Sequence, residues 1–523
     1  MTDEPIRGGY VDGDWIGAEN RETFASANPA TGETIATVAT ATATDVAAAV
    51  SAAETAQPAW RDRSYVDRAR YLWAVHDRLR ERKAELGELV TRECGKEIDE
   101  GLADVEEAIH MVEWAAGNAR HPHGDVVPSE LPGRDAYMRR RPRGVVGSIT
   151  PWNFPIAIPF WHVAVTLVEG NTVVWKPAEQ TPRCGEVVAE LFAAAGIPDG
   201  VFNLVQGAAE TGRAVVEDDR VDTVLFTGSA AVGHDIDATL GGVAGRDCSL
   251  EMGGKNAVVV TDRADLDVAL NAAVLSAFKT TGQRCVSAER LIVHEDVYDE
   301  FRDRFVDAAS RVAVGDPLDE GTFMGPLIDE SAVEKFHEYN ALAREEGATV
   351  LVDRATLDGA EAGSGGSRGA SGDADAVPAG HEAGHWVGPF VYELPFDPES
   401  RVLSEEVFGP HVALIPYSGG IERAVEIHDA VDYGLAGAVV SEDYRQLNYY
   451  RDHATAGLAY ANLPCIGAEV QLPFGGLGKS GKGSPSAREV IEAVTERTAW
   501  TVNNDPEVSL AQGLSADLRF EEE

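Results

Sequence analysis

An early part of the chain carries apolar and charged positions in a helical rhythm. Between residues 43 and 116 apolar side chains recur every three or four positions with charges between them, for example at 71–73, Val75 and Leu79. This spacing places the apolar side chains on one face of an α-helix. We therefore expect amphipathic helices here that cover another layer of the protein.

From Gly144 onward, short apolar runs alternate with helical stretches. The runs are 145–149, 172–175, 201–205 and 221–226, then 258–260 and 291–293 on either side of a helical stretch at 266–278. One of the helices is expected to begin at Pro182 and to end before Gly196 and Pro198. Continuous apolar strands that alternate with helices predict parallel, doubly wound sheets. Two α/β lobes are the simplest count.

Length and charge narrow the class of protein. With 523 residues, 44% of them hydrophobic, the chain is long enough for two or three lobes with cores of their own. The 87 Asp and Glu against 44 Lys and Arg give a formal charge of −43, which excludes a nucleic-acid or anionic-membrane binder. Because salt screens such repulsion, the charge predicts a halophilic protein; an acidic mesophile protein is the alternative.

The sequence also predicts a cytoplasmic protein without a metal. Residues 1–10 lack the apolar core of a signal peptide, and no stretch approaches the roughly 18 apolar residues that span a bilayer. The five cysteines are too scattered for a disulfide or metal framework. His381 and His385 form the one paired spacing among the histidines, and they lie in or beside the segment 358–384. That segment is rich in Gly, Ala, Ser, Asp and Glu, so we expect a flexible, solvated insertion.

Three polar side chains stand at predicted turns where chemistry can take place. Cys285 follows Arg284, whose charge favours the reactive thiolate. Glu251, at the end of an apolar run, can act as a general base. The Asn153 amide, in a turn stiffened by two prolines, can donate to an oxyanion. Each has an ordinary alternative: an inert thiol, a surface carboxylate at a strand end, and a cap of the following helix.

Three further loops follow predicted strands at the carboxyl edge of a parallel sheet, where dinucleotides bind. Lys-Pro-Ala-Glu at 176–179 offers a cation and a carboxylate for ribose hydroxyls. Phe-Thr-Gly-Ser at 226–229 starts a helix whose free N–H groups can receive a phosphate. Glu-Val-Phe at 406–408 adds a carboxylate and an aromatic ring from the other lobe. The Gly-x-Gly-x-x-Gly fingerprint is absent from these turns, so each loop taken alone is better explained as an ordinary turn.

Taken together, these segments resemble the aldehyde dehydrogenase superfamily in order and spacing, from about residue 10 to residue 503. The resemblance rests on Pro-Trp-Asn-Phe-Pro at 151–155, the loops at 176–179 and 226–229, Leu-Glu-Met-Gly-Gly-Lys at 250–255, Gly-Gln-Arg-Cys at 282–285, Glu-Val-Phe-Gly-Pro at 406–410 and Pro-Phe-Gly-Gly at 473–476. It implies two doubly wound, Rossmann-like α/β lobes, one for the cofactor and one catalytic, with a small β oligomerisation arm.

The resemblance also implies an NAD- or NADP-dependent oxidation of an aldehyde. Cys285 attacks the aldehyde carbon, and the Asn153 amide with the Cys285 backbone N–H holds the oxyanion. Hydride leaves for the nicotinamide, and Glu251 activates the water that hydrolyses the thioester. A carboxylate at Glu179 favours NAD, because it would repel the 2′-phosphate of NADP. The implied cofactor residues are Thr150, Pro151, Trp152, Lys176, Glu179, Gly228, Ser229, Glu406 and Phe408.

The resemblance further divides the chain and predicts a homodimer or homotetramer. Residues 1–122 and 143–253 are expected to form the dinucleotide-binding domain, and 254–461 the catalytic domain with the 358–384 insertion. Residues 123–142 and 484–503 form the oligomerisation arm, and 504–523 an acidic tail. Trp500 and Val502 alternate with polar neighbours, as in a strand paired between subunits.

The substrate is predicted from smaller similarities. Segments 128–132, 462–464 and 467–470 are similar to a subgroup that oxidises 2-oxoglutarate semialdehyde (2,5-dioxopentanoate). An acidic substrate needs a cationic group, for which Arg284 is the candidate. The alternatives are another aliphatic or succinate semialdehyde dehydrogenase, an acylating enzyme that uses coenzyme A, and a non-catalytic binding or structural protein. Glu251 argues against the acylating enzyme, because a thiolate acceptor needs no water-activating base.

Overall fold

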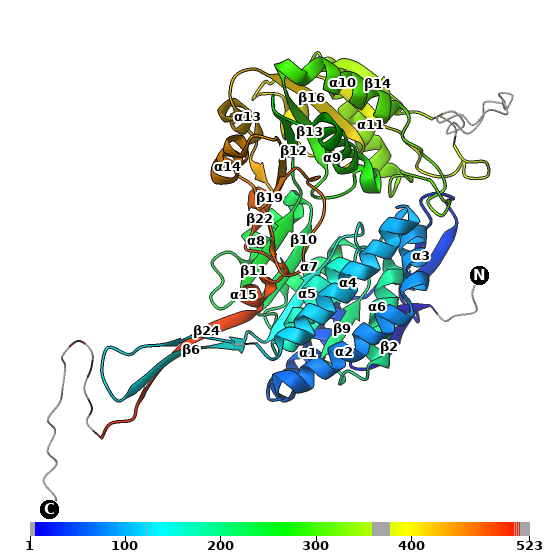
Figure 1. Ribbon diagram of the computed structural model, residues 1–523. Helices are drawn as coiled ribbons and strands as arrows, with labels where there is room; N and C mark the ends of the chain where they lie inside the picture. Colours follow the sequence, from blue (N-terminus) through cyan, green and yellow to red (C-terminus); the bar gives the residue numbers. More distant parts are fainter. Residues whose placement is uncertain are drawn as a thin grey trace, which may run out of the picture.

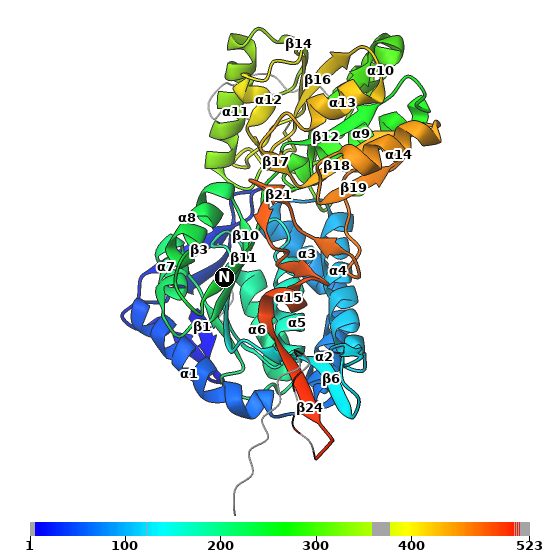
Figure 2. The same ribbon diagram turned by 90° about the vertical axis from the view of Figure 1, so that its left-hand side faces the viewer.

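A computed structural model describes residues 6–121, 123–357, 377–506, 508, 510 and 512. It consists of two α/β lobes and an arm of long antiparallel strands that projects from the lower lobe (Figures 1 and 2). The expected fold class is confirmed: each lobe contains a largely parallel sheet, and a small antiparallel sheet forms the arm.

The lower lobe is built on an eight-stranded sheet of order β2-β1-β9-β8-β7-β10-β11-β22. The five central strands are parallel. The chain order reverses between β7 and β10, which is a topological switch point where ligands bind beyond the carboxyl ends of the strands. The strands are β1 (Arg7–Val11), β2 (Asp14–Gly17), β7 (Val145–Ile149), β8 (Thr172–Lys176), β9 (Phe202–Val205), β10 (Thr223–Gly228), β11 (Asp247–Met252) and β22 (Gly481–Lys482).

Helices cover both faces of this sheet. The predicted helical region, 43–116, forms four helices, and the predicted start at Pro182 is confirmed. Helix α5 is buried along its whole length, because it packs against the sheet on one side and against α2 and α4 on the other. The helices are α1 (Ala43–Arg61), α2 (Tyr65–Glu81), α3 (Lys83–Cys94), α4 (Ile98–Asn118), α5 (Ala157–Val168), α6 (Pro182–Ala194), α7 (Ala209–Glu217), α8 (Ala230–Leu240) and α15 (Val490–Val494).

The upper lobe is built on a seven-stranded sheet of order β14-β15-β16-β13-β12-β18-β19, parallel except for β14. Its strands are β12 (Asn256–Val260), β13 (Ala288–His294), β14 (Thr349–Asp353), β15 (Phe390–Glu393), β16 (His411–Tyr417), β18 (Ala436–Val440) and β19 (Leu458–Ala461). Its helices are α9 (Leu266–Phe278), the 3₁₀ turn η1 (Lys279–Gly282), α10 (Glu295–Ser310), α11 (Glu330–Glu345), α12 (Arg401–Ser404), α13 (Ile421–His428) and α14 (Tyr444–His453).

The arm is a three-stranded antiparallel sheet of order β24-β6-β5. Strand β24 (Thr495–Asn503) pairs with β6 (Arg134–Pro142) along its whole length, and the Trp500 ring stacks on Tyr137. The other small strands are β3 (Thr23–Ala27), β4 (Thr34–Ala39), β5 (Val126–Val127), β17 (Tyr433–Gly434), β20 (Pro473–Phe474), β21 (Leu477–Gly478) and β23 (Ser486–Ala487).

Part of the predicted 358–384 insertion, residues 358–376, and most of the tail after residue 506 lie outside the described residues. The described remainder of the insertion contacts the body of the protein. His381 Nε2 lies 3.5 Å from Asp316 Oδ2, and the His381 carbonyl accepts a hydrogen bond from Trp386 Nε1 at 2.8 Å. In the described part of the chain, no helix is long and apolar enough to cross a membrane. Nor do the described residues contain a cluster of three or more His, Cys, Asp or Glu that could hold a metal.

Candidate active site

A cavity of about 1090 Å³ lies between the lobes, over the carboxyl edge of the lower sheet. A volume of this size is at the upper end of small-molecule and cofactor sites, so a dinucleotide fits. Its lining includes Cys285, Glu251 and Asn153 together with every predicted cofactor residue, which the chain supplies from both lobes. The structure therefore brings together the residues that the sequence placed in separate loops.

The turn before Cys285 has a strained backbone. Thr280 and Thr281 have φ of +54° and +56°, a left-handed conformation that β-branched residues rarely adopt. Gly282 follows at φ +72°, and a Cβ there would lie 2.3 Å from the Gly409 carbonyl oxygen, so only glycine fits. Strain of this kind persists only where the surroundings hold it, and it clusters at functional sites.

Glu100, which the sequence analysis did not single out, holds this turn from helix α4. The residue is 6% exposed, and its carboxylate accepts hydrogen bonds from Thr280 N at 2.9 Å and Thr280 Oγ1 at 2.6 Å. It also pairs with Arg284. Arg284 Nε in turn donates to Thr280 Oγ1 at 2.8 Å. A local sequence pattern could not reveal Glu100, because its partners are distant in the chain.

Asn153 contacts the turn before Cys285 directly. Its side chain is buried, and Nδ2 donates to the Gln283 carbonyl at 3.0 Å. An amide nitrogen carries two hydrogens, so one is left for a ligand beside Cys285. The alternative that Asn153 caps the next helix is wrong, because α5 begins at Ala157 and its N-cap residue is Ile156.

The Asn153 backbone is held by a buried ion pair. Lys96 Nζ donates to the Asn153 carbonyl at 2.7 Å and to Asp104 Oδ2 at 2.8 Å, and both charged side chains are fully buried. Asp104 Oδ1 accepts from Ala157 N at 2.6 Å, at the start of α5. The pair therefore fixes both ends of the short turn that presents the amide.

Glu251 belongs to β11 and is 1% exposed, so the alternative of a surface carboxylate is wrong. Burial raises its pKa to about 8, a hydrogen bond with Cys285 lowers it, and the charge of Glu406 raises it. Among the described residues, Glu251 Oε1 has no hydrogen-bond partner. A buried carboxyl with a free oxygen and a pKa near neutrality is suited to general base catalysis.

The Cys285 thiol has a pKa raised well above its usual range. Burial is the largest cause, followed by the charge of Glu251 and a side-chain hydrogen bond with it. Arg284 lowers this pKa, as the sequence suggested, but its effect is outweighed. The thiol therefore keeps its proton until a base such as Glu251 removes it.

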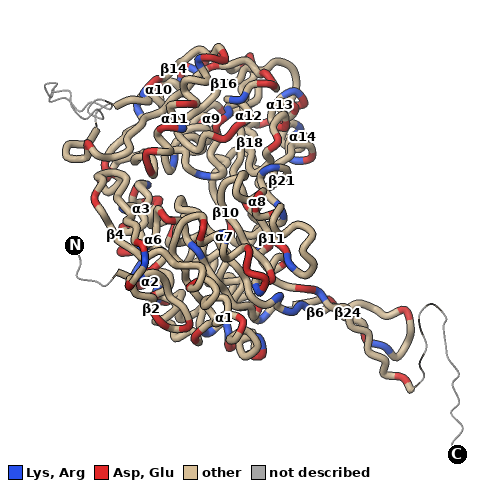
Figure 3. The backbone as a smooth tube through the Cα atoms, turned by 180° about the vertical axis from the view of Figure 1, so that it is seen from behind, with Lys and Arg blue, Asp and Glu red and all other residues tan. Residues whose placement is uncertain are grey.

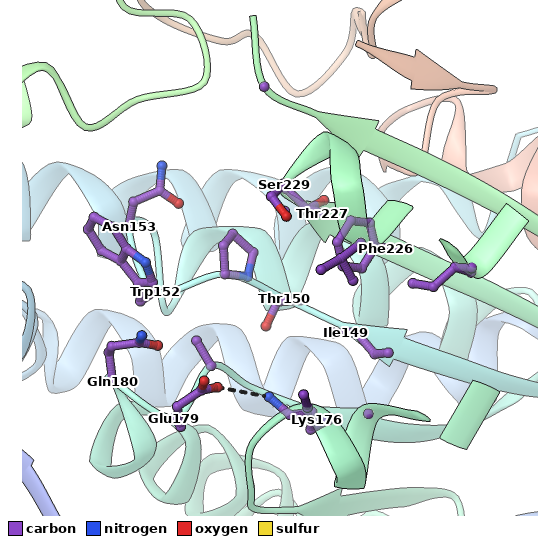
Figure 4. Close-up of a pocket in the computed structure, with 18 of the residues that line it drawn as sticks. Ile149, Thr150, Trp152, Asn153, Lys176, Glu179, Gln180, Phe226, Thr227 and Ser229 are labelled. Atoms are coloured by element: carbon purple, nitrogen blue, oxygen red, sulfur yellow. Dashed lines mark hydrogen bonds and ion pairs between the residues drawn. The ribbon is translucent and has the colours of Figure 1, made fainter. Parts of the chain in front are cut away.

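The residues predicted to contact the ribose and the phosphates of a dinucleotide face one another across the cavity (Figure 4). Lys176 Nζ lies 3.3 Å from Glu179 Oε2, and the Glu179 side chain is 43% exposed. Ser229 is the N-cap residue of α8, and within the described residues its side chain makes no capping hydrogen bond. The N–H groups of the first turn of α8 thus suit a phosphate. Arg213 and Lys335, which no motif indicated, add cations to the lining.

Glu406 and Phe408 come from the upper lobe. Glu406 Oε1 accepts from Gly254 N at 2.9 Å, and burial followed by the charge of Glu289 raises its pKa to about 7. The Phe408 ring meets Trp152 edge-on, with centroids 5.7 Å apart. Phe408 has φ of +64°. This wall therefore also contains a residue in an unfavourable backbone conformation.

Comparison with known proteins shows the family of this chain. The model of the aldehyde dehydrogenase family matches residues 15–500. Alpha-ketoglutaric semialdehyde dehydrogenase of Bacillus subtilis is 35% identical over 500 residues, covering 95% of this chain and 97% of that protein. Alpha-ketoglutarate semialdehyde dehydrogenase of Haloferax volcanii is 37% identical over 475 residues, covering 90% and 93%. The crystal structure of betaine aldehyde dehydrogenase from Staphylococcus aureus in complex with NAD+ is 29% identical, with a TM-score of 0.88 over 97% of this chain and 96% of that one. The chain therefore belongs to the aldehyde dehydrogenase family and is an NAD(P)-dependent aldehyde dehydrogenase.

Proposed function

We propose that Cys285, Asn153 and Glu251 carry out the oxidation. The observation that carries this proposal is that a thiol, an amide and a buried carboxyl from separate segments meet on one cavity wall. Sγ of Cys285 bonds to the aldehyde carbon, and its proton passes to the Glu251 carboxylate. The second N–H of Asn153 Nδ2 and the Cys285 backbone N–H stabilise the oxyanion that forms.

Once the carbon has lost a hydride, for which a bound dinucleotide would be the acceptor, the acyl group stays on Cys285 as a thioester, and Glu251 has a second task. After it has released the first proton, its carboxylate accepts a proton from water, whose oxygen attacks the thioester carbon. The carboxylic acid leaves, and Cys285 regains its thiol. General base catalysis of this kind contributes about 10² to 10⁴ in rate.

We propose NAD as the preferred cofactor; when bound, it supplies the hydride acceptor. Lys176 and Glu179 hold the adenosine ribose, Gly228 and Ser229 the pyrophosphate, and Glu406 with Phe408 the nicotinamide end, beside Thr150, Pro151 and Trp152. The half-exposed Glu179 carboxylate supports NAD over NADP, because a 2′-phosphate would lie beside a negative charge. The related S. aureus enzyme was crystallised with NAD+.

For the substrate we propose 2-oxoglutarate semialdehyde, with Arg284 as the cation for its carboxylate. Two of the relatives are named for this substrate. Arg284 contacts Glu100 and Thr280 through Nη2 and Nε. Since a guanidinium has five N–H donors in a fork, Nη1, which makes no hydrogen bond to the described residues, is left for a carboxylate. The related betaine aldehyde dehydrogenase makes a cationic aldehyde the natural competitor.

Steady-state rates on four aldehydes test the substrate: 2-oxoglutarate semialdehyde, succinate semialdehyde, betaine aldehyde and acetaldehyde. We expect the highest kcat/KM for the first. Arg284→Met should lower kcat/KM for the two anionic aldehydes by about 10- to 100-fold, the value of a hydrogen bond to a charged group. Acetaldehyde is the internal control for damage to the turn. A preference for acetaldehyde or betaine aldehyde in the wild type would end the proposal.

We also propose that the arm pairs subunits into a homodimer or homotetramer. Strand β24 is an edge strand, and its Trp500 is 46% exposed. Exposed edges of this length are normally covered in native proteins. We also propose the domain division given above, with a dinucleotide-binding domain at 1–122 and 143–253, a catalytic domain at 254–461 and the arm at 123–142 and 484–503. Light scattering on the purified enzyme tests the pairing of subunits, and a monomer at micromolar concentration would contradict this pairing.

The charge supports a proposal about salt. Asp and Glu are spread over both lobes (Figure 3), and the net charge is −43. We propose that the protein is halophilic. Unfolding in low and multimolar KCl tests this, because the Debye length falls to about 3 Å at 1 M salt. Equal stability in both would refute it.

A further inference from the structure

Glu289 is a buried carboxylate that the reaction described above does not use. It belongs to β13, shortly after Cys285, and is 2% exposed. Its Oε2 accepts from Lys255 Nζ at 2.5 Å, and the Lys255 side chain is fully buried. Removing two charges from water is costly unless good pairing and further hydrogen bonds compensate it. The position of this pair therefore needs an explanation.

The Glu289 carboxylate also binds two consecutive backbone amides of the 406–408 turn. Val407 N donates to Oε1 and Oε2 at 2.9 and 3.0 Å, and Phe408 N donates to Oε1 at 2.8 Å. Phe408 has φ of +64°, which a phenylalanine rarely adopts without support. These hydrogen bonds from the Val407 and Phe408 N–H groups fix the peptide units that precede the two residues. They therefore support the unfavourable φ of Phe408.

The opposite side of the same turn is held by the loop that follows Glu251. Glu406 Oε1 accepts from Gly254 N at 2.9 Å. The Glu406 carboxylate lies close to the backbone of this loop, since a Cβ on Gly253 would lie 2.1 Å from Glu406 Oε2. Glu406 and Phe408 thus keep their places on the cavity wall only while the turn keeps its shape.

We propose that Glu289 is a positioning residue: paired with Lys255, it holds the 406–408 turn in the conformation that receives the nicotinamide end of the dinucleotide. The inference rests on the proposed roles of Glu406 and Phe408. A turn that is ordered before binding loses little conformational entropy when the ligand arrives. Releasing it should therefore weaken binding without changing any group that touches the ligand.

Hydrogen exchange on the ligand-free enzyme, read by mass spectrometry on peptides that cover 406–408, tests the first half of the proposal. In Glu289→Ala the two amides lose their acceptor, and we expect them to exchange about tenfold faster or more. NAD+ titration tests the second half. Ordering two or three backbone residues on binding should raise the Kd by about 30-fold or more.

The double variant Glu289→Gln with Lys255→Met supplies the rescue. It removes both charges together and leaves an amide oxygen to accept from Val407 and Phe408, so we expect it to restore most of the protection and of the NAD+ affinity. If Glu289→Ala does not fold, Glu289→Gln alone takes its place. In that variant Lys255 competes with both amides for the same oxygen.

Asp222→Ala is the matched control. Asp222 also accepts a backbone N–H, from Val145 at 2.8 Å, but at the amino end of β7, the opposite edge of the lower sheet. We expect it to leave both readouts unchanged.

Unchanged exchange at 406–408 in Glu289→Ala overturns the inference, and so does faster exchange with unchanged NAD+ affinity. Failure of the double variant to restore both readouts does so as well. Neither measurement uses an aldehyde, so a wrong substrate leaves the test standing. If the wild type binds no NAD+, the proposed function fails, while the exchange data still decide what holds the turn.

Discussion

The proposed role of Glu251 as the base predicts that the activity depends on pH. Burial raises its pKa to about 8 from an ordinary value of 4.5. A base works only when it is unprotonated, so activity should be lost as the pH falls through 8, well above the range of an exposed glutamate. With this pKa, about 9% of the carboxyl is ionised at pH 7 and about 91% at pH 9. We therefore expect kcat to rise about tenfold between these pH values.

Glu251→Gln separates this group from its neighbours. The amide has nearly the same shape but cannot take a proton, so kcat should fall by about 10² to 10⁴, and the rise between pH 7 and pH 9 should disappear. Glu406, whose pKa is about 7, would leave a residual change centred one unit lower. The assay is NADH formation in steady state, in buffers of constant ionic strength.

Two results would refute this reasoning about Glu251. One is a wild-type profile that is flat from pH 7 to pH 9. The other is a Glu251→Gln enzyme that keeps the full rise. Alkylation of Cys285 by iodoacetamide at each pH reports the thiol separately, because thiolate is the reacting form. The pKa of this thiol is raised well above its usual range, so alkylation should be slow at pH 7.

Three further changes have expected outcomes. Asn153→Ala should lower kcat by about 10² to 10³, the value of one oxyanion donor, in the same NADH assay; a change below twofold would exclude that role. Glu179→Ser should raise the ratio of kcat/KM for NADP to that for NAD by about tenfold, because the repelling charge is gone; an unchanged ratio would show that Glu179 does not select the cofactor. Trp500→Glu puts a charge on the arm strand, and light scattering should then find smaller oligomers; an unchanged mass would place the interface elsewhere.

The sequence predicted elements whose signal is local. The stretch 266–278 is a helix over the same residues, and Pro182 is the first residue of α6. Apolar periodicity and a proline at a helix start act within a few residues, so they can be read without the fold. No such signal marked β3 and β4, which are short strands with many small residues.

The sequence motifs predicted the residues that line the candidate site, but they did not predict the side chains that hold those residues in place. Cys285, Glu251 and Asn153 line one cavity. Glu100 and Glu289 act through partners in distant segments. In a chain with 87 acidic residues, composition gives no reason to choose these two. Only the fold, which buries them beside backbone amides, distinguishes them from solvated carboxylates.

Arg284 illustrates how the fold changes the chemistry that a motif suggests. Its place next to Cys285 in the sequence predicts a stabilised thiolate, yet its guanidinium pairs with Glu100 and stabilises the strained turn. Burial and Glu251 therefore have the larger effects on the pKa of the Cys285 thiol, and both raise it. In the proposed mechanism, removal of the thiol proton then depends on the same carboxyl that activates water. If Glu251 is the base in both steps, kcat/KM and kcat should rise together between pH 7 and pH 9, whichever of these two steps limits the rate.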